Sequence, residues 1–475
     1  MSVVSCLSAG WMLDHLSFIN KSGYQLCCSH DPSARASFDD TVIAASSDVD
    51  LIEATNSCRK VSGSKPTAEK AKTDQMLKET YVFREEFFYV LKPHIAANLQ
   101  SELQQSCSVV ALEDGGSELQ ESPKSVDSYV IAKTKKKRKR NGELNHGERE
   151  ALEYHLKISG KILEGTMSLA QVGLRSGFLQ PSSTKQFCAK TPVSGHIDCG
   201  LAELCEMAKW FPPVNDREQR SVCMMKKETS ISEQVQVSCV TENTTNHAKI
   251  ITLMGQKYLF PPNSAFLLSD ISFMQPLLDY NKKFDIIVID PPWENKSVKR
   301  SNRYSYLSHW QIKQIPIPAL AAPDCLVVTW VTNRQKHLHF VKTDLYPHWC
   351  VDGVVEWFWV KITRSGDFVF PLDSFHKKPY EVLVLGRVKG STDVPLSRVS
   401  EDEVLPNHKL IVSVPSTLHS HKPPLTEILK EYTKSDVECL ELFARNLQPG
   451  WTSWGNEVLK FQHMDYFTTL QNNSD

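Results

Sequence analysis

The feature that most constrains the fold is a series of short, nearly continuous apolar segments in the second half of the chain. In order they read AFLLSDI, FDIIVID, CLVVTWVT, VVEWFWVKI, YEVLVLGRV, KLIVSVP and CLELFAR. Strands that are covered on both faces have this composition, and helical patterns such as residues 425–432 fall between them. The pattern predicts an α/β domain with a largely parallel sheet.

Composition divides the rest of the chain into segments around this domain. With 475 residues, the chain is long enough for two or three domains. Apolar residues at helical spacing begin at Glu79 and again after Glu150, so we expect a mainly helical N-terminal domain. The expected boundaries are a loosely ordered leader at 1–78, the helical domain at 79–216 with a basic insertion near 133–147, a polar linker at 217–246, the α/β domain at 247–465 and a tail at 466–475.

Bulk charge and cysteine content exclude several classes of protein. Lys and Arg total 54 against 55 Asp and Glu, so net charge indicates neither a nucleic-acid nor a membrane partner. The 13 cysteines have no regular spacing, and no apolar run is long enough for a membrane span, so we expect an intracellular protein with free thiols. Cys188, His196, Cys199 and Cys205 lack the paired Cys-x-x-Cys steps of structural zinc, and no metal is expected.

A basic run interrupts the helical N-terminal region. Seven of the eight residues from Lys133 to Arg140 are basic, and charges so dense repel one another, so the run should be exposed. It suits a nuclear-import signal, a contact with phosphates, or a solvated loop. We expect the nucleus as the location, with the cytosol as an alternative and the mitochondrion as a minor one.

The stretch FDIIVIDPPWENKS places Asp290, Pro291, Pro292 and Trp293 directly behind an apolar strand. Ligands of open α/β sheets bind at the carboxyl ends of strands. Neither proline has a backbone N–H, and their fixed φ angles hold the local carbonyls in a rigid turn. A strand that ends in a proline turn, with the tryptophan merely packing, is the alternative interpretation.

These residue types suit one particular chemistry. The Asp290 carboxylate and the proline carbonyls can accept both hydrogens of a planar amine, and Trp293 can stack on the attached ring. The exocyclic amine of adenine is such a group, and acceptors on its hydrogens favour a localised lone pair. They also stabilise the positive charge that develops as nitrogen attacks an electrophilic methyl group. We assign Asp290 orientation and electrostatics rather than full general-base work.

The loop ENKSVKRSNRYSYLSHW follows the motif and mixes basic with aromatic residues. Basic groups contact a nucleic-acid backbone and aromatic rings stack on bases. Because a duplex hides the adenine amine, the target must be unpaired or flipped out. A solvated basic loop is the alternative. The substrate candidates are Lys296, Lys299, Arg300 and Arg303 in the loop, with Tyr304 and Trp330 lining the base pocket.

From Asp270 to Glu457 the sequence resembles the adenosine N6-methyltransferase family, whose hallmark is the Asp-Pro-Pro-Trp motif. The segments SDI at 269–271, TWVT at 329–332 and WVK at 359–361 resemble further family segments in the same order, as do HSHKPP and ELFARNLQPGWTSWGNE near the C-terminus. The resemblance implies a Rossmann-like domain that binds S-adenosylmethionine. The cofactor contacts that it implies are Asp270, Ile271, Asp290, Lys422, Arg445, Asn446, Asn456 and Glu457. The chain departs from the family where Glu457 stands in place of Gln, and where Asn446 directly follows Arg445.

The resemblance implies methyl transfer to N6 of adenine in RNA, with 2′-O-methyladenosine of small nuclear RNA as the finer expectation and DNA adenine as a second candidate. No metal, membrane or obligatory protein partner is expected. A catalytically inactive nucleic-acid-binding scaffold is one alternative, although such relatives lose the Asp or Trp that this chain keeps. A protein amino-group methyltransferase is another, but its motif begins with Asn.

Overall fold

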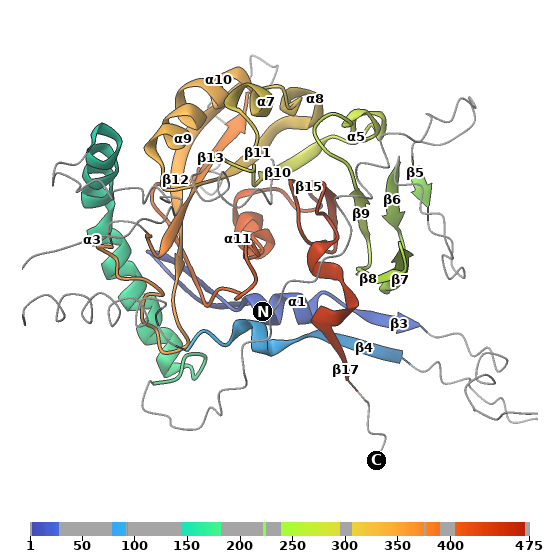
Figure 1. Cartoon of the computed structure of the whole chain (residues 1–475), viewed down its shortest axis with the longest axis horizontal. Coiled ribbons are helices and arrows are strands. Elements are labelled where there is room, and N and C mark those ends of the chain that lie inside the picture. The colour runs from blue at the N-terminus through green and yellow to red at the C-terminus, as the bar shows by residue number, and fades with distance from the viewer. Residues whose placement is uncertain are drawn as a thin grey trace, which may run out of the picture.

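The computed structural model describes residues 2–27, 78–91, 93, 145–181, 222–224, 239–294, 306–374, 377–389 and 404–470. Its main feature is a sheet of 12 strands, curved in Figure 1. In spatial order the strands are β1 (Val3–Leu7), β2 (Gly10–Leu13), β14 (Leu410–Ser413), β12 (Val351–Lys361), β13 (Tyr380–Val388), β11 (Ala321–Val331), β10 (Phe284–Ile289), β15 (Cys439–Leu442), β16 (Trp451–Trp454), β9 (Ser264–Leu267), β6 (Val240–Asn243) and β5 (Val222–Met224).

The centre of this sheet is parallel, which confirms the α/β fold with a mostly parallel sheet. β10 pairs in parallel with β11 on one side and β15 on the other, and β16 and β9 continue the parallel run. β13 is antiparallel to both β11 and β12. The carboxyl ends of the five parallel central strands therefore meet at one edge of the sheet.

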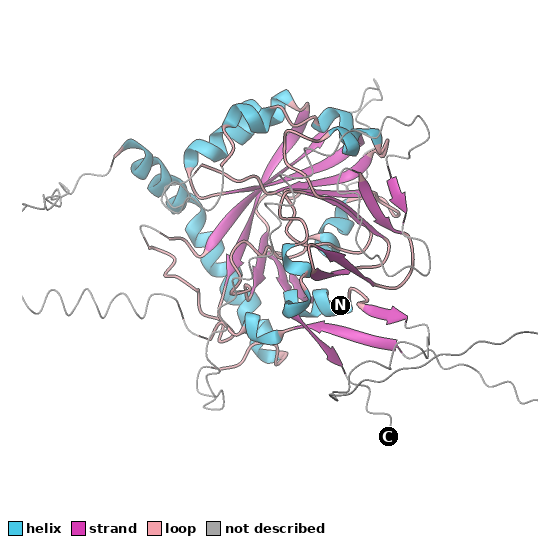
Figure 2. Ribbon diagram, turned by 45° about the vertical axis from the view of Figure 1, so that its right-hand side comes forward, coloured by secondary structure: helices cyan, strands magenta, loops and turns pink. Residues whose placement is uncertain are grey.

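Helices cover both faces of the sheet, as Figure 2 shows. The helices are α1 (His15–Lys21), α3 (His146–Arg175), α5 (Gln275–Asp279), α7 (His309–Lys313), α8 (Ile317–Leu320), α9 (Gln335–Phe340), α10 (Tyr346–His348) and α11 (Thr426–Leu429). Side chains of α3, α7, α8 and α9 share one apolar cluster with Ile287, Ile289 and Val327 of the sheet. Ile428 and Leu429 of α11 pack on the opposite face. Because both faces of the sheet are covered, the central strands are continuous apolar runs in the sequence.

Residues 2–27 correct the expectation of a loosely ordered leader over 1–78. β2 pairs in parallel with β14, and Trp11 is 1% exposed with its indole N–H donating to Glu431 at 3.1 Å. Asp14 caps α1 by accepting from the backbone N–H of Ser17. The segment lacks sustained periodicity because its three strands are only 5, 4 and 3 residues long. The remainder of the predicted leader, up to residue 77, lies outside the described residues.

The helix expected from Glu79 is also wrong. Residues 78–83 form strand β4, which pairs with β3 (Gln25–Cys27) and β17 (Phe467–Leu470) in a small antiparallel sheet near both chain ends (Figure 1). A short 3-10 turn, Glu85–Phe88, follows. The aromatic and β-branched residues of this segment suit a strand, and Phe83 and Phe87 are buried against Tyr466. Tertiary packing therefore overrides the apparent helical spacing, and part of the expected tail belongs to the fold.

The helix predicted after Glu150 is confirmed as α3, which begins at a capping box formed by Asn145 and Glu148. It does not belong to a separate front domain, because its inner face contacts β1, β2 and β14 of the main sheet. Two short strands, β5 and β6, also place parts of the expected linker in this sheet. Strands β7 (Lys249–Leu253) and β8 (Gln256–Phe260) form a separate hairpin. The described helices include none that is long and apolar enough to cross a membrane.

Candidate active site

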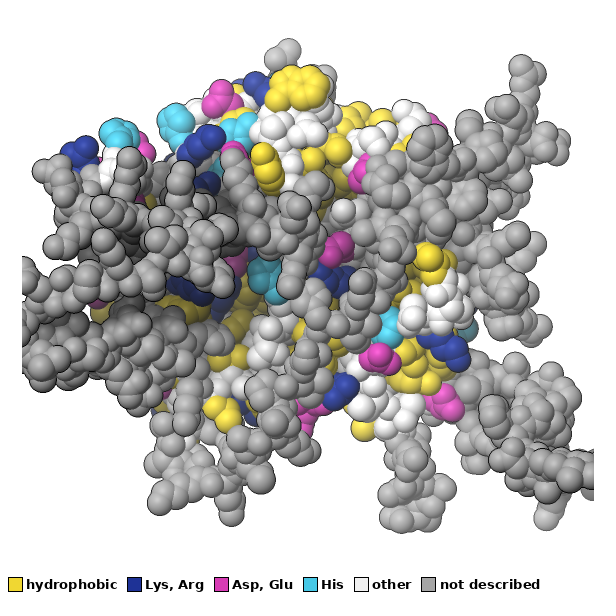
Figure 3. Space-filling model, viewed as in Figure 1, with side chains coloured by type: hydrophobic (Ala, Val, Ile, Leu, Met, Phe, Trp, Pro, Cys, Tyr) yellow, Lys and Arg dark blue, Asp and Glu magenta, His cyan; other side chains and the backbone are white. Residues whose placement is uncertain are grey.

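The residues predicted for the site gather at the carboxyl edge of the parallel strands. Asp290 directly follows β10, and Arg445 lies shortly after β15. Asp270 lies shortly after β9, and Asn456 follows β16. Near the middle of the face in Figure 3, acidic, basic and histidine side chains lie close together. The parallel sheet thus collects polar residues that are up to 186 positions apart between Asp270 and Asn456.

The Asp-Pro-Pro-Trp motif is held by backbone hydrogen bonds on every side. The N–H of Asp290 donates to the carbonyl of Leu442 on the neighbouring strand at 3.2 Å. The carbonyl of Pro291 accepts from the N–H of Trp293 at 2.8 Å, and that of Pro292 accepts from Leu307 at 3.1 Å. Each proline carbonyl keeps a second lone pair for another donor. The motif is therefore a rigid array of acceptors, and Asp290 is 9% exposed within it.

Two cations hold the Asp290 carboxylate. Arg445 Nη1 lies 3.0 Å from Oδ2, and Lys422 Nζ lies 3.6 Å from Oδ1. Arg445 also places Nε 3.0 Å from Glu457, whose other oxygen is 2.7 Å from Lys460. Burial alone would raise the pKa of Glu457, but Arg445 and Lys460 outweigh it and lower the pKa. The Asp290 carboxylate therefore lies between two cations, in a site that is largely shielded from water.

Glu381 on β13 joins a second part of this network. Its carboxylate lies 2.5 Å from Lys361 and forms a direct ion pair with Lys422. Burial alone would raise the pKa of Glu381, but the two ammonium groups leave it well below its ordinary value. Burial acts to lower the pKa of Lys422, whereas Asp290 and Glu381 raise it more strongly. Lys422 is thus a charged lysine fixed between two carboxylates.

Glu441 on β15 is a buried acid that has no cation as a hydrogen-bond partner within the described part of the chain. Its carboxyl accepts from Gln448 at 3.2 Å, and Gln448 accepts in turn from Thr426 at 3.1 Å. Burial, followed by repulsion from Asp290, raises the pKa of Glu441 to about 7. Glu441 and Asp290 are therefore carboxyl groups in opposite environments, since Asp290 is paired with two cations whereas Glu441 is bonded to the amide of Gln448.

The two tryptophans predicted to contact the base are buried. Trp293 is 4% exposed, donates from Nε1 to the carbonyl of Trp330 at 2.8 Å, and packs against His337. Trp330 is 1% exposed and lies beneath Lys422, whose Nζ is 4.7 Å from the ring centroid. A small cavity lined by Trp330, Lys422 and Asn446 adjoins this ring. In this structure both tryptophans support the polar residues rather than present an open ring face.

The remaining predicted residues lie partly at this edge and partly outside the described chain. Asp270 accepts from the N–H and hydroxyl of Ser272, at 2.9 and 2.6 Å, in the turn after β9. Ile271 is half-buried beside it, and Asn456 is exposed. The predicted substrate residues Lys296, Lys299, Arg300, Arg303 and Tyr304 lie outside the described residues, as do the whole basic run at 133–140 and the Cys188, His196, Cys199 and Cys205 group.

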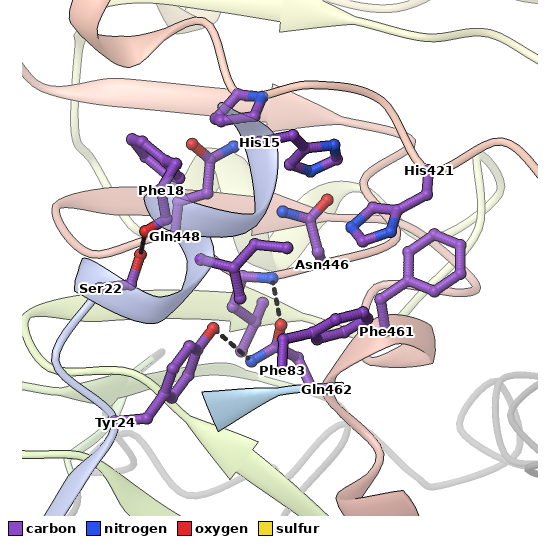
Figure 4. Close-up of a pocket in the computed structure, with 13 residues that line it drawn as sticks. His15, Phe18, Ser22, Tyr24, Phe83, His421, Asn446, Gln448, Phe461 and Gln462 are labelled. Carbon is purple, nitrogen blue, oxygen red and sulfur yellow. Dashed lines mark hydrogen bonds between the residues drawn. The ribbon is translucent and has the colours of Figure 1, made fainter. Parts of the chain in front are cut away.

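A cavity lies behind Lys422, where the preceding His421 faces His15 of α1 (Figure 4). The two ring centroids are 4.6 Å apart, and Asn446 lines the same cavity. Burial lowers the pKa of His15 to about 3 and that of His421 well below its ordinary value. The cavity has room for about one water molecule, so it is too small for a nucleobase. It joins the N-terminal segment to the loop that carries Lys422.

The members of the network that sequence reasoning missed include Glu381, Glu441, Gln448 and Lys460. Two of them had a signal, because Glu381 in YEVLVLGRV and Glu441 in CLELFAR are single acids inside apolar strands. A charge in a buried strand requires a partner and so indicates a site. Gln448 lies in the loop after β15 and Lys460 begins a 3-10 turn after β16, so neither had such a signal. Among the described residues, no group of three His, Cys, Asp or Glu is placed to bind a metal.

Comparison with known proteins agrees with this arrangement. Residues 284–457 match the MT-A70 family. The chain is 55% identical over 481 residues to the human N(6)-adenine-specific methyltransferase METTL4, and the match covers 100% of both chains. It is 36% identical to the N6-methyladenosine RNA methyltransferase MTA1 of Pyricularia oryzae, over 46% of this chain and 58% of that one. It is 35% identical to the DNA N6-methyl methyltransferase of Caenorhabditis elegans, over 45% of this chain and 56% of that one. This chain is therefore a member of the MT-A70 family.

Proposed function

We propose that this protein is an S-adenosylmethionine-dependent methyltransferase that modifies N6 of adenine in RNA. The observation that carries the proposal is the Asp290 carboxylate, which lies at the carboxyl end of a central parallel strand beside two rigidly held proline carbonyls. The names of the human and fungal relatives support N6-adenine chemistry and RNA as the substrate class. The finer substrate that we propose is 2′-O-methyladenosine in small nuclear RNA.

The residues present fit the cofactor. S-adenosylmethionine carries a carboxylate, an ammonium group and two ribose hydroxyls, and it supplies an electrophilic methyl group when bound. Lys422 and Arg445 are cations suited to the carboxylate, and Asp290 suits the ammonium group. Asn456 and Glu457 can bond ribose hydroxyls. Asp270 and Ile271 lie at the end of β9 on the same edge, where they can contact the adenine ring of the cofactor.

The mechanism follows from the acceptors that the motif holds in place. The adenine amine donates one hydrogen to Asp290 and the other to a proline carbonyl, which localises its lone pair on nitrogen. The negative carboxylate then stabilises positive charge as it develops on this nitrogen. Because backbone hydrogen bonds fix the acceptors beforehand, little reorganisation is needed in the transition state. The proton leaves after transfer, through Asp290 or water.

DNA adenine is the second candidate substrate, supported by the name of the nematode relative. A protein amino group is a weaker candidate, since the motif begins with Asp. We further propose that the protein acts in the nucleus, for which the basic run at 133–140 is the support, and that it needs no protein partner for methyl transfer.

The test compares the wild-type protein with Asp290→Asn and with the control Asp352→Asn. Asp352 pairs with Lys389 on the surface, where both side chains are more than 60% exposed. Each protein receives labelled cofactor and RNA with adenosine or 2′-O-methyladenosine, or single-stranded DNA. We expect Asp290→Asn to lower kcat on RNA by about 10²–10³-fold, which is typical for the loss of one electrostatic group, whereas the control keeps its activity. Methylation of the protein only, or equal activity of all three proteins on RNA, would contradict the proposal.

A further inference from the structure

Two histidines lie directly behind the Asp-Pro-Pro-Trp motif. His337 of α9 is 0% exposed, and its Nε2 is 3.0 Å from the backbone carbonyl of Glu294, the residue after Trp293. Its Nδ1 is 2.9 Å from Nε2 of His309 on α7. The two imidazoles thus form a hydrogen-bonded chain that ends on the backbone of the motif segment.

The chemistry of the Glu294 carbonyl fixes where the hydrogens lie in this chain. A carbonyl oxygen can only accept, so Nε2 of His337 must carry a hydrogen. In a neutral ring Nδ1 is then an acceptor, and it accepts from Nε2–H of His309. A second hydrogen on His337 would face the N–H of His309, and the chain would break unless His309 changed tautomer. With hydrogen on Nε2 of both rings, both hydrogen bonds form while His337 is neutral.

Packing leaves the pair little freedom to move. The His337 ring lies 4.9 Å from the Trp293 ring, measured between centroids, and the His309 ring stacks on Phe340 at 3.9 Å. Arg334 donates to the same Glu294 carbonyl at 2.9 Å. The carbonyl after the motif thus receives two donors, and Trp293 is held between its indole hydrogen bond and the imidazole.

We propose that His337 is a positioning residue for methyl transfer, which acts with His309 in the neutral state to hold the Trp293–Glu294 backbone and thereby the acceptors of the motif. The expected effect on the rate rests on the proposed function, whereas the histidine chain itself does not. A displacement of about 1 Å in an active site can cost about 10²-fold in rate. His337 does not contact Asp290 or the proline carbonyls, and it acts through its hydrogen bond to Glu294 in the same segment.

The charges around the pair favour the neutral form. Burial lowers the pKa of His337 to about 4, with Arg334, Lys336 and His309 acting in the same direction and the bond to the Glu294 carbonyl opposing them. Burial and Lys336 lower the pKa of His309, against the opposing charges of Glu294 and Asp344. Because the folded pKa of His337 lies below the ordinary value of 6.5, its contribution to stability is present above pH 6.5 and is lost as the pH falls toward 4.

The test uses two replacements that each keep one nitrogen position of the ring. His337→Gln keeps a donor near Nε2 that can reach Glu294, whereas His337→Asn places its amide near Nδ1 and loses that donor. His339→Gln is the matched control, because His339 is exposed on the same helix. Each purified full-length protein is assayed for kcat and for KM of the cofactor, at a temperature where its unfolding curve shows it to be folded.

We expect His337→Asn to lower kcat at least about tenfold with KM changed less than about threefold, and His337→Gln to stay within about threefold of wild type. Equal losses in the two variants, or a loss confined to KM, would overturn the positioning role.

Nitrogen-15 NMR of labelled histidines gives a readout without activity. A neutral His337 with hydrogen on Nε2 at pH 7 supports the chain, and hydrogen on Nδ1 refutes it. If wild-type protein methylated no adenine oligonucleotide, the proposed function would fail, while the NMR result would still decide the histidine chain.

Discussion

Replacement of Glu381 by Gln tests whether the charge network stabilises the fold as well as the site. The Glu381 side chain is 25% exposed, and its two partners Lys361 and Lys422 are 24% and 14% exposed. Loss of one partner from a fully buried ion pair costs about 3–5 kcal/mol, and an exposed pair is worth about 0–1 kcal/mol. This partly buried cluster lies between these limits, so we expect a loss of about 2 kcal/mol in the free energy of unfolding.

The dependence on pH separates the charge effect from a packing effect. The pKa of folded Glu381 lies below its ordinary value of 4.5, so the stabilisation is complete above about pH 4.5 and is lost as the pH falls below it. The difference between wild type and Glu381→Gln should therefore be constant from pH 5.5 to 7. It should shrink by about 1 kcal/mol at pH 3.5, because the wild-type carboxyl is then mostly protonated in the unfolded chain.

Urea denaturation followed by circular dichroism measures both quantities. The control is Asp352→Asn, which removes an ion pair of nearly equal length, 2.6 Å, on the exposed surface. In a thermal melt at pH 7 we expect no measurable change in the control and a decrease of about 2–3 °C in the Tm of Glu381→Gln. Equal stability of Glu381→Gln and wild type at pH 7 would refute the reasoning, as would a difference that does not depend on pH.

Two further predictions concern a buried acid and a glycine. Because the pKa of folded Glu441 is raised to about 7, its ionisation destabilises wild type by about 3 kcal/mol as the pH rises from 4.5 to 7. In denaturation at pH 5 and 8, the free energy of unfolding of Glu441→Gln should therefore increase relative to that of wild type as the pH rises. A difference that stays constant with pH would contradict the raised pKa. Gly10→Ala should release the N-terminal strands, because φ is +144° and a Cβ would lie 2.0 Å from the Leu410 carbonyl oxygen. Limited proteolysis should then cleave this variant before residue 27. The control Gly160→Ala on α3, where a Cβ would have no atom within 4 Å, should give the same proteolytic fragments as wild type.

The central sheet could be predicted because strands that are buried on both faces are continuous apolar runs in the sequence. Runs such as FDIIVID and CLVVTWVT can only be accommodated between two layers, and they became β10 and β11. The N-terminal strands left no such mark, because they are short and owe their order to partners near residues 410 and 467. Phe83 and Phe87 showed helical spacing, but their burial against Tyr466 depends on the C-terminal segment. The spacing of apolar residues within one segment carries no information about contacts with segments hundreds of residues away.

The site was predictable where its residues follow strands. Asp290 and Arg445 could be located because each directly follows an apolar run, and their ion pair at 3.0 Å follows from the parallel pairing of β10 and β15. The contacts of Trp293 had no local signal, because its indole N–H donates to the Trp330 carbonyl and its ring packs against His337, both from other segments; its stacking on a base stays a prediction. Glu381 joins the network from β13, a strand antiparallel to β11, and strand order of this kind has no signature in one sequence.

The pairing of β2 with β14 has a consequence for the synthesis of the chain. Gly10 lies opposite Leu410, so these partners are about 400 residues apart. At about 5–20 residues per second, a ribosome needs roughly 20–80 s to make the intervening chain. During that time Trp11 and Met12, which are fully buried at the end, have no sheet to join. The first strands to be made are therefore among the last to dock, and slower elongation lengthens the time that their apolar side chains wait for residues 410–413.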